Sequence, residues 1–348
     1  MTESSKAFGE GESKGHEREA RLLVVTATEV LAVDPKEGVV RGDGLEGRHP
    51  TCLATDPWGQ ARAWCGTAES GLLRSHDRGR SWEPSGLPGQ HVMSVAASPA
   101  REGLVWAGTE PSALWRSTDG GVNWEQMEGL EELPSSSDWA FPPKPETHHV
   151  RWIACHPDRA GRVWLAIEAG ALVGTADGGG TWKDRVPGGP RDTHELALHP
   201  SRPDVLRVAA GDGYFESEDG GESWTTPRDG LGAGYLRSVA IDPGDPDVVI
   251  VSGASRPRTT YVAGRSDGRL FRREGLGSWE RIGPGWPDPP ETIAPLLISG
   301  RRAGELWAAD ERGVHGSTDG GRRWEPVAAF PATPSNLRGL ALVAPRVG

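Results

Sequence analysis

Ser117-Thr118-Asp119-Gly120-Gly121-Val122-Asn123-Trp124 is the stretch that decides the fold, because the chain repeats it. A hydroxyl and a carboxylate at this spacing can bond nearby backbone N–H groups, and glycine adopts the left-handed backbone that a tight turn needs. We therefore predict a hairpin turn at each copy, with the tryptophan starting the next strand. The good copies carry Asp77, Asp119, Asp177, Asp219 and Asp319, and a degenerate copy without the aspartate ends at Ser278-Trp279.

The spacing of the copies predicts the architecture. Neighbouring copies recur at a period near 42 residues, which is typical of a four-stranded blade repeated around an axis. A second repeat supports this prediction, because apolar segments such as 91–99 and 149–157 each end at a proline. Proline cannot continue a β-ladder, so we interpret these segments as the innermost strands of the blades.

Six blades follow from the repeats, and a seventh follows from the two ends of the chain. Residues 23–33 supply a second and a third strand without a first, and residues 337–343 supply a first strand alone. We predict an all-β, seven-bladed β-propeller of four-stranded antiparallel blades, closed by strands from both termini. The single domain spans 21–345, with blades at about 21–42 plus 337–345, 50–84, 91–126, 149–184, 193–226, 236–281 and 291–326.

Charge and composition argue against several classes of partner. The chain has 348 residues, a net charge of −11 and no run of Lys and Arg, so we expect no nucleic-acid partner. No apolar run approaches the roughly 18 residues of a membrane span. Residues 1–20 read as a disordered polar tail without the apolar core of a signal peptide. We expect a cytoplasmic monomer, since ring closure removes exposed sheet edges.

The repeat resembles the BNR repeat, or Asp-box, Ser-x-Asp-x-Gly-x-Thr-Trp, and the resemblance covers about residues 21–345. That superfamily of WD40/YVTN-like propellers includes sialidases, xyloglucanases, sortilin-type receptors and a photosystem assembly factor. The resemblance implies a glycosyl hydrolase-like fold with each box between the third and fourth strands of a blade. It also implies that the box aspartates are structural and that ligands bind on the opposite face, where the inner strands begin.

An alignment of the inner strands on their terminal prolines places candidate residues at that channel mouth. The outermost register holds His49, His91, His149, Asp192 and Tyr235. Two residues further in are Thr51, Met93, Arg151, His194 and Arg237, with Arg338 aligned to Arg237. The loops between second and third strands should bring Glu69, Glu110, Glu168, Asp212 and Glu311 to the same face.

The leading hypothesis is a small anionic or sugar-like ligand, bound and hydrolysed or rearranged at this mouth. Arg151, Arg237 and Arg338 would hold the anion through guanidinium hydrogen bonds. His149 and His194 would transfer protons, and Glu168 and Asp212 would be the carboxylates of a hydrolase. Tyr235 and Trp139 would line the ligand.

Two other functions fit the same residues. A metal-dependent enzyme would hold a divalent ion with His49, His91, His149 and His194, since imidazole is the commonest metal ligand. A non-catalytic scaffold would bind a protein partner on its rim, as the assembly-factor branch of the resemblance implies. We do not expect sialidase activity, because the Phe/Tyr-Arg-Ile-Pro motif is missing and Tyr235 has only Glu195 as a conceivable nucleophile partner.

Two insertions, 127–148 and 253–268, should overhang the mouth, because long loops in compact folds are often lids or binding loops. In the first, Trp139 and Phe141 would offer a flat apolar platform to a sugar or would simply hold their own loop in place. The second carries Arg256, Arg258, Tyr261 and Arg265.

Overall fold

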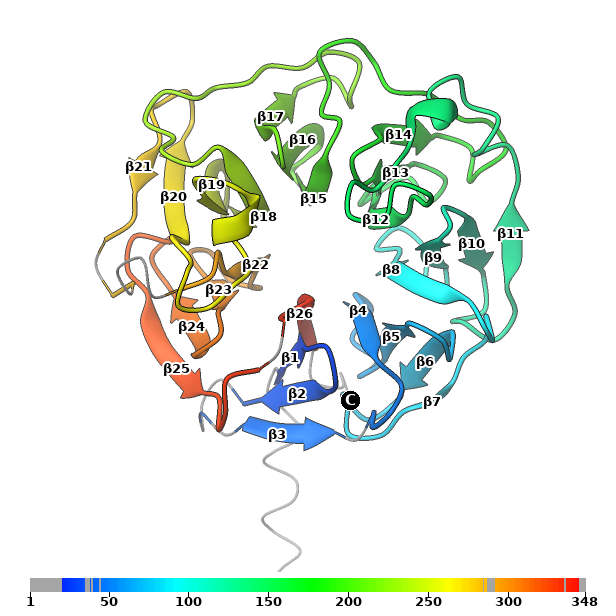
Figure 1. Ribbon diagram of the computed structural model, residues 1–348, viewed down its shortest axis with the longest axis horizontal. Coiled ribbons are helices and arrows are strands. Elements are labelled where there is room, and N and C mark those ends of the chain that lie inside the picture. The colour runs from blue at the N-terminus through cyan, green and yellow to red at the C-terminus, as the bar shows by residue number, and fades with distance from the viewer. Residues whose placement is uncertain are drawn as a thin grey trace, which may run out of the picture.

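Seven antiparallel sheets surround a central channel (Figure 1), as the sequence predicts. The computed structural model describes residues 21–34, 38, 40–43, 45–283, 285–286, 292–334 and 336–343, with the backbone alone at 40–43. The predicted tail, 1–20, lies outside the described residues, as does Glu291 of the sixth predicted inner strand. No helix in the described part of the chain is long and apolar enough to span a membrane.

Six of the sheets run outward from the channel in chain order, and the seventh begins with the last strand of the chain, followed by the first three. The inner strands are β4 (Pro50–Thr55), β8 (His91–Ala97), β12 (Val150–Cys155), β15 (Thr193–His199), β18 (Tyr235–Asp242), β22 (Leu296–Ser299) and β26 (Gly339–Val343). The second strands are β5 (Ala63–Thr67), β9 (Val105–Glu110), β13 (Val163–Ile167), β16 (Arg202–Ala210), β19 (Asp245–Ala254), β23 (Leu306–Ala309) and β1 (Arg21–Val25).

The third strands of the seven blades are β6 (Leu72–Ser75), β10 (Leu114–Ser117), β14 (Ala171–Thr175), β17 (Gly213–Ser217), β20 (Arg269–Glu274), β24 (Gly313–Ser317) and β2 (Val30–Val33). The outer strands are β7 (Glu83–Pro84), β11 (Glu125–Met127), β21 (Glu280–Arg281), β25 (Glu325–Ala329) and β3 (Val40–Asp43). Two short 3-10 helices, η1 (Ser136–Asp138) and η2 (Pro257–Thr259), lie in the two insertions.

The ring closes as predicted, because β26 pairs with β1 and completes the sheet β26-β1-β2-β3. Five of the sheets have four strands, and the sheets β12-β13-β14 and β15-β16-β17 have three. Single bridges, Gly174↔Lys183 and Glu216↔Thr225, stand where their fourth strands would be. In the first of these sheets, the outer segment is diverted, since Asp184 accepts hydrogen bonds from the backbone N–H and the hydroxyl of Ser135.

The hydrophobic core is divided among the interfaces between neighbouring blades. One cluster joins Trp106 of β9 to Leu165 and Ile167 of β13, and another joins Leu22 of β1 to Trp307 of β23. Trp106 and Leu165 have no exposed surface. Each blade therefore packs its two faces against the two neighbouring blades, as in other repeat folds.

The eight-residue repeats form hairpin turns between third and fourth strands, which we call Ser-x-Asp turns. In one of them, the Ser117 hydroxyl donates to Asp119 at 2.8 Å and accepts the Gly121 N–H at 2.8 Å. The Asp119 carboxylate also accepts the Asn123 N–H at 2.9 Å, and this bond is the main reason that its pKa falls to about 2. These contacts occupy the carboxylate, which supports a structural role.

The Ser-x-Asp turns also join consecutive blades. The carbonyl oxygen of the first glycine accepts a hydrogen bond from the preceding blade, at Gly120 from Trp64 Nε1 (3.1 Å) and at Gly220 from Trp164 Nε1 (3.2 Å). Arginines make the same contact elsewhere, from Arg116 to Gly178 (2.9 Å) and from Arg272 to Gly320 (2.8 Å). We call this contact the blade latch.

A β-bulge recurs near the start of five inner strands. The pairing between inner and second strands skips one residue in β4, β8, β12, β15 and β18. A bulge changes the direction of the side chain of the residue that is skipped, so that it departs from the regular alternation of a strand. The skipped residues are Thr51, Met93, Arg151, His194 and Arg237.

The blade latch predicts a specific sensitivity at Gly121. A Cβ there would lie 2.7 Å from Ser85 Oγ and 2.9 Å from Trp64 Nε1, whereas at Gly188 a Cβ would meet nothing within 4 Å. Both glycines have positive φ, so alanine costs about 1 kcal/mol of backbone strain at either position. We expect Gly121→Ala to lower the free energy of unfolding by about 1–3 kcal/mol more than Gly188→Ala, because only the first overpacks an interface. Urea denaturation followed by tryptophan fluorescence measures both, and equal losses would contradict the latch.

Candidate functional site

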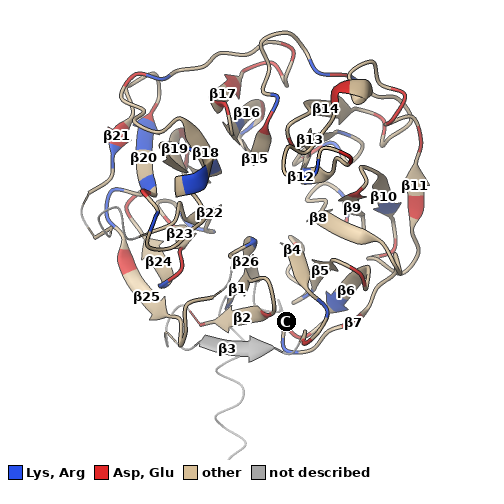
Figure 2. Ribbon diagram, viewed as in Figure 1, with Lys and Arg blue, Asp and Glu red and all other residues tan. Residues whose placement is uncertain are grey.

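The inner-strand starts and the loops between second and third strands lie on one face, as the alignment predicts. The backbone shows this at three blades, where Ala68 N–H donates to His49 O, Glu168 N–H to His149 O, and Gly211 N–H to Asp192 O. Figure 2 shows that β4 and β8 carry no charged residue, whereas β18 does. The arginines that the inner strands and their starts bring to the mouth are therefore Arg151 of β12, Arg237 of β18 and Arg338 before β26.

Glu168 is the centre of the charged cluster at the mouth. Its Oε2 accepts a hydrogen bond from His149 Nε2 at 2.6 Å and lies 3.7 Å from Arg151 Nε. Its Oε1 faces His194 Nε2 at 4.0 Å. Burial alone would raise the pKa of Glu168, but Arg151 and the His149 bond outweigh it and hold the pKa at about 2. The carboxylate is ionised throughout the physiological range.

His194 is held in one orientation beside two carboxylates. It is 2 % exposed, and its Nδ1 lies 2.5 Å from the carbonyl oxygen of Leu236. Its Nε2 lies 3.1 Å from the Tyr235 hydroxyl and 3.7 Å from Asp192 Oδ1. Burial lowers the pKa of His194, so the neutral ring is favoured. A carbonyl oxygen only accepts, so the proton of the neutral ring is on Nδ1.

The three arginines predicted to bind an anion are not all available to a ligand, because two of them donate to backbone carbonyl oxygens. Arg237 is buried and donates to the carbonyl oxygens of Ala294 (2.6 Å) and Leu337 (2.5 Å), with its guanidinium over the Tyr261 ring. Arg338 donates to Pro50 O at 2.9 Å. Arg151 makes no hydrogen bond within the described residues and keeps 28 % of its side chain exposed. The prediction is thus corrected for Arg237, whose donors hold backbone instead of a ligand.

A cavity of about 80 Å³ opens directly below the mouth. Arg151, His194 and Arg338 line its upper part, and Leu53, Val95 and Leu340 line its floor. Beyond this floor the channel widens to about 440 Å³ between apolar side chains such as Ile153, Leu196 and Leu342. Arg151 and His194, which line the smaller cavity, belong to the layer of residues skipped at the β-bulges, which we call the bulged layer.

Both insertions reach the mouth. In 127–148, Phe141 packs edge-on against His149 with ring centroids 4.9 Å apart, and Lys144 Nζ lies 3.3 Å from Glu110 Oε1. In 253–268, the Tyr261 hydroxyl bonds Tyr235 at 3.1 Å. Trp139 is 5 % exposed and belongs to the core between two blades. The prediction of Trp139 as a ligand platform is therefore not supported, because its ring is packed inside.

Several predicted combinations are not formed. The four histidines do not make a metal site: His49 is exposed, His149 Nε2 is bonded to Glu168, and only His194 belongs to the one group of potential ligands that the described residues contain. Tyr235 bonds His194 and Tyr261, while the Glu195 carboxylate accepts from Ser238, so no Tyr–Glu pair is present among the described contacts. Asp212 is exposed at the mouth, and the carboxylate brought against Glu168 and His194 is that of Asp192.

Three residues complete the cluster without a role predicted from the sequence, namely Glu110, Asp192 and Tyr261. Asp192 was aligned at the outermost register, and its Oδ1 lies 3.7 Å from His194 Nε2. Glu110 lies 3.6 Å from His149 Nδ1, and Tyr261 comes from an insertion. The alignment on terminal prolines was the signal that could have grouped Asp192 with Glu168.

The fold and the mouth define the chain as a seven-bladed propeller with a compact charged cluster at one end of its channel. No protein-family model matches the chain, and no curated protein matches it. Solved structures do match: a GH74 enzyme of Niastella koreensis has a TM-score of 0.63 at 16% identity, covering 87% of this chain and 53% of that one. An ancestral GH74 enzyme has a TM-score of 0.61 at 15% identity, covering 85% and 38%.

A shorter neighbour is similar over nearly its whole length. YCF48 bound to D1 peptide has a TM-score of 0.58 at 18% identity, covering 94% of this chain and 97% of that one. The chain thus spans between 38% and 53% of the two GH74 chains. At such identities the similarity shows the fold alone, and the neighbours include both hydrolases and a protein solved with a peptide.

The depressed pKa of Glu168 predicts a pH-dependent contribution to stability. Because the pKa falls from 4.5 unfolded to about 2 folded, the stabilisation is complete above about pH 5 and is lost as the pH falls toward 2. We expect Glu168→Gln to lower the free energy of unfolding at pH 7 by about 3 kcal/mol in metal-free buffer, with the difference from wild type shrinking in acid.

Urea denaturation between about pH 3.5 and 7 in buffer containing EDTA measures this difference. The Glu168 carboxyl of the unfolded chain titrates within this range. Glu132→Gln, at an exposed position, is the matched control and should follow wild type at every pH. A Glu168→Gln protein with the same pH profile as wild type would show that Glu168 is not held in its charged form by the fold.

Proposed function

We propose that the protein binds the anionic group of a small molecule in the bulged layer of the channel, with Arg151 as its main contact. The observation that carries the proposal is that Arg151 lines the cavity without a hydrogen bond to any described residue. A guanidinium presents five donors in a planar fork that matches a carboxylate or a phosphate. Those donors are available to a ligand.

The electrostatics of this layer favour an anion. Burial, together with the nearby Arg151, lowers the pKa of Arg237 to about 10 and lowers that of Arg338. Burial raises the pKa of Glu195 to about 8, so this carboxyl is neutral at pH 7 and does not balance the guanidinium groups. The Glu168 carboxylate is shared with His149. The channel side of Arg151 therefore carries positive charge in a poorly solvated place, where an anion is attracted more strongly than in water.

The size of the cavity limits what enters it. At about 80 Å³ it holds a few water molecules, which a carboxylate or phosphate group would replace. The remainder of the ligand would extend into the mouth between Phe141 and Tyr261. His149 is 1 % exposed and enclosed by Glu168 and Phe141, so the acid–base role predicted for it is not part of this proposal.

Peptide binding is the second candidate, and the paired insertions favour it. The propeller that matches nearly end to end was solved with a D1 peptide, and here the two insertions bring Phe141 against His149 and Tyr261 against Tyr235. A peptide whose carboxylate reaches Arg151 would use the same contact. A carboxyl-terminal peptide and its amidated form distinguish this source of the anion from a small molecule.

Calorimetric titration of the full chain with sodium phosphate and sodium glucuronate, in buffer with EDTA, tests the proposal. We expect Arg151→Gln to weaken binding at least about tenfold, because charge-assisted hydrogen bonds contribute about 1.5–3 kcal/mol.

Arg256→Gln is the matched control, since it removes the same charge from an exposed position in the 253–268 insertion, and its affinity should stay within about twofold of wild type. Circular dichroism and melting temperature confirm the fold of both variants. Binding that is equal in Arg151→Gln and wild type, or absent for both probes and both peptides, overturns the proposal.

A further inference from the structure

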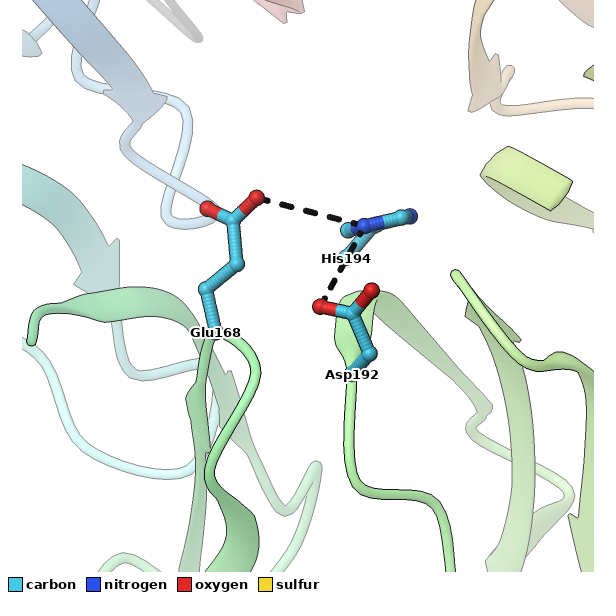
Figure 3. Close-up of side chains that lie close together, drawn as sticks. All are labelled: Glu168, Asp192 and His194. Carbon is cyan, nitrogen blue, oxygen red and sulfur yellow. Dashed lines mark ion pairs between the residues drawn. The ribbon is translucent and has the colours of Figure 1, made fainter. Parts of the chain in front are cut away.

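We infer that Glu168, Asp192 and His194 form a binding site for a divalent metal ion at the rim of the channel. Glu168 follows β13, whereas Asp192 and His194 lie at the start of β15 in the next blade, and the three side chains point toward one another (Figure 3). Their nearest ligand atoms all lie within 4.8 Å of one another. Among the described residues, this is the single group of three or more such side chains.

The imidazole of His194 is oriented as metal ligands are. The Leu236 carbonyl fixes the proton on Nδ1, so in the neutral ring the lone pair of Nε2 is directed toward the two carboxylates. A backbone carbonyl that holds the second ring nitrogen is the usual outer partner of a ligating histidine. This observation is independent of the acidic residues and points to a ligand.

The carboxylates are also held from outside. Glu168 Oε2 is bonded to His149 Nε2, which leaves Oε1 toward His194. Asp192 Oδ1 accepts the backbone N–H of Ala169 at 3.0 Å. Outer-shell hydrogen bonds of this kind orient ligands and increase metal affinity.

No hydrogen bond joins His194 Nε2 to the carboxylate of Asp192 or to that of Glu168. The Nε2 atom lies 3.7 Å from Asp192 Oδ1 and 4.0 Å from Glu168 Oε1, beyond hydrogen-bond distance. Ligand atoms bound at about 2.0–2.2 Å to one ion are themselves roughly 3–3.5 Å apart, so a small inward movement completes the site. Asp192, whose side chain is 31 % exposed, has room to make it.

Tyr235 competes for the same lone pair. Its hydroxyl lies 3.1 Å from Nε2 and 3.1 Å from the Tyr261 hydroxyl. When an ion takes Nε2, the Tyr235 hydroxyl retains Tyr261 as a partner, so the exchange leaves no buried hydroxyl unsatisfied.

The donor set selects the class of ion. Imidazole suits first-row transition ions and carboxylates suit harder ones, so two carboxylates and one imidazole favour Mn²⁺ or Zn²⁺. Three protein ligands leave a coordination position for water or for a ligand oxygen, as in catalytic rather than structural sites. No arginine is among its ligands, but the site adjoins the proposed anion site, since Glu168 lies 3.7 Å from Arg151 and His194 lines the same cavity. Titration in EDTA and titration with metal alone therefore test the two sites separately.

Calorimetric titration of the EDTA-treated full chain with MnCl₂ and ZnCl₂ tests the inference. We expect one ion per chain for wild type and at least about a tenfold loss of affinity for Asp192→Asn, which removes one charged ligand at a partly exposed position. Asp212→Asn removes the same charge at the same mouth but outside the ligand group, and its affinity should stay within about threefold of wild type.

A spectroscopic readout separates ligation from general electrostatics. In Mn²⁺-loaded wild type, pulsed electron paramagnetic resonance should detect a coordinated imidazole nitrogen, and His194→Gln should lose that signal. If His194→Gln fails to fold, the nitrogen signal of wild type and the Asp192→Asn affinity still decide the question. Failure of wild type to bind either ion, or equal loss in Asp192→Asn and Asp212→Asn, overturns the inference while leaving anion binding in EDTA untouched.

Discussion

The blade latch is the interaction on which the ring depends. A glycine carbonyl in a Ser-x-Asp turn accepts from a tryptophan or an arginine of the preceding blade, as at Gly120, Gly178, Gly220 and Gly320. The latch works because the Asp119-type carboxylate and the Ser117-type hydroxyl bond the backbone inside the turn, which leaves the glycine carbonyl facing outward. At these four junctions, neighbouring blades are therefore tied together at the face opposite the mouth, and the mouth is free to carry polar residues.

The bulged layer carries the charged and titratable side chains of the inner strands, and mainly apolar side chains line the channel below it. One residue in each of five inner strands leaves the pairing, and three of the five, Arg151, His194 and Arg237, are basic or titratable. The layers beneath are apolar, with Val95, Leu196 and Leu340 around the channel. Burial of the two side chains in this layer shifts the pKa of His194 downward and that of Glu195 upward.

Sequence repetition predicted the ring more fully than the site. The Ser-x-Asp copies and the proline-ended segments fixed the blades, the closure by β26 and β1, and the shared face of His149 and Glu168. The sequence could not show that Arg237 would donate to Ala294 and Leu337, because those acceptors are backbone atoms of other blades. It could not place Trp139 in the core either, since an aromatic residue in an insertion packs or projects according to tertiary contacts alone.

The grouping of ligands was harder still to predict. The alignment of four histidines at the mouth favoured a metal site made of histidines alone. The orientation of each histidine depends on its local partner, however, and His149 Nε2 is hydrogen-bonded to Glu168 Oε2 at 2.6 Å. The set that forms mixes Glu168 from one blade with Asp192 and His194 from the next. The last two are two residues apart in the sequence, whereas their proximity to Glu168 depends on the packing of neighbouring blades.

The protonation state of His194 tests the central claim that the mouth presents the Nε2 lone pair, whose partner is the Tyr235 hydroxyl, to two carboxylates. Nitrogen-15 NMR of the imidazoles in the metal-free protein at about pH 7, with His194→Gln for assignment, measures it directly. The account predicts a neutral ring with the proton on Nδ1 and an unprotonated Nε2. A doubly protonated ring would contradict it, because the imidazolium would balance Glu168 and Asp192 by itself and leave no place for a cation.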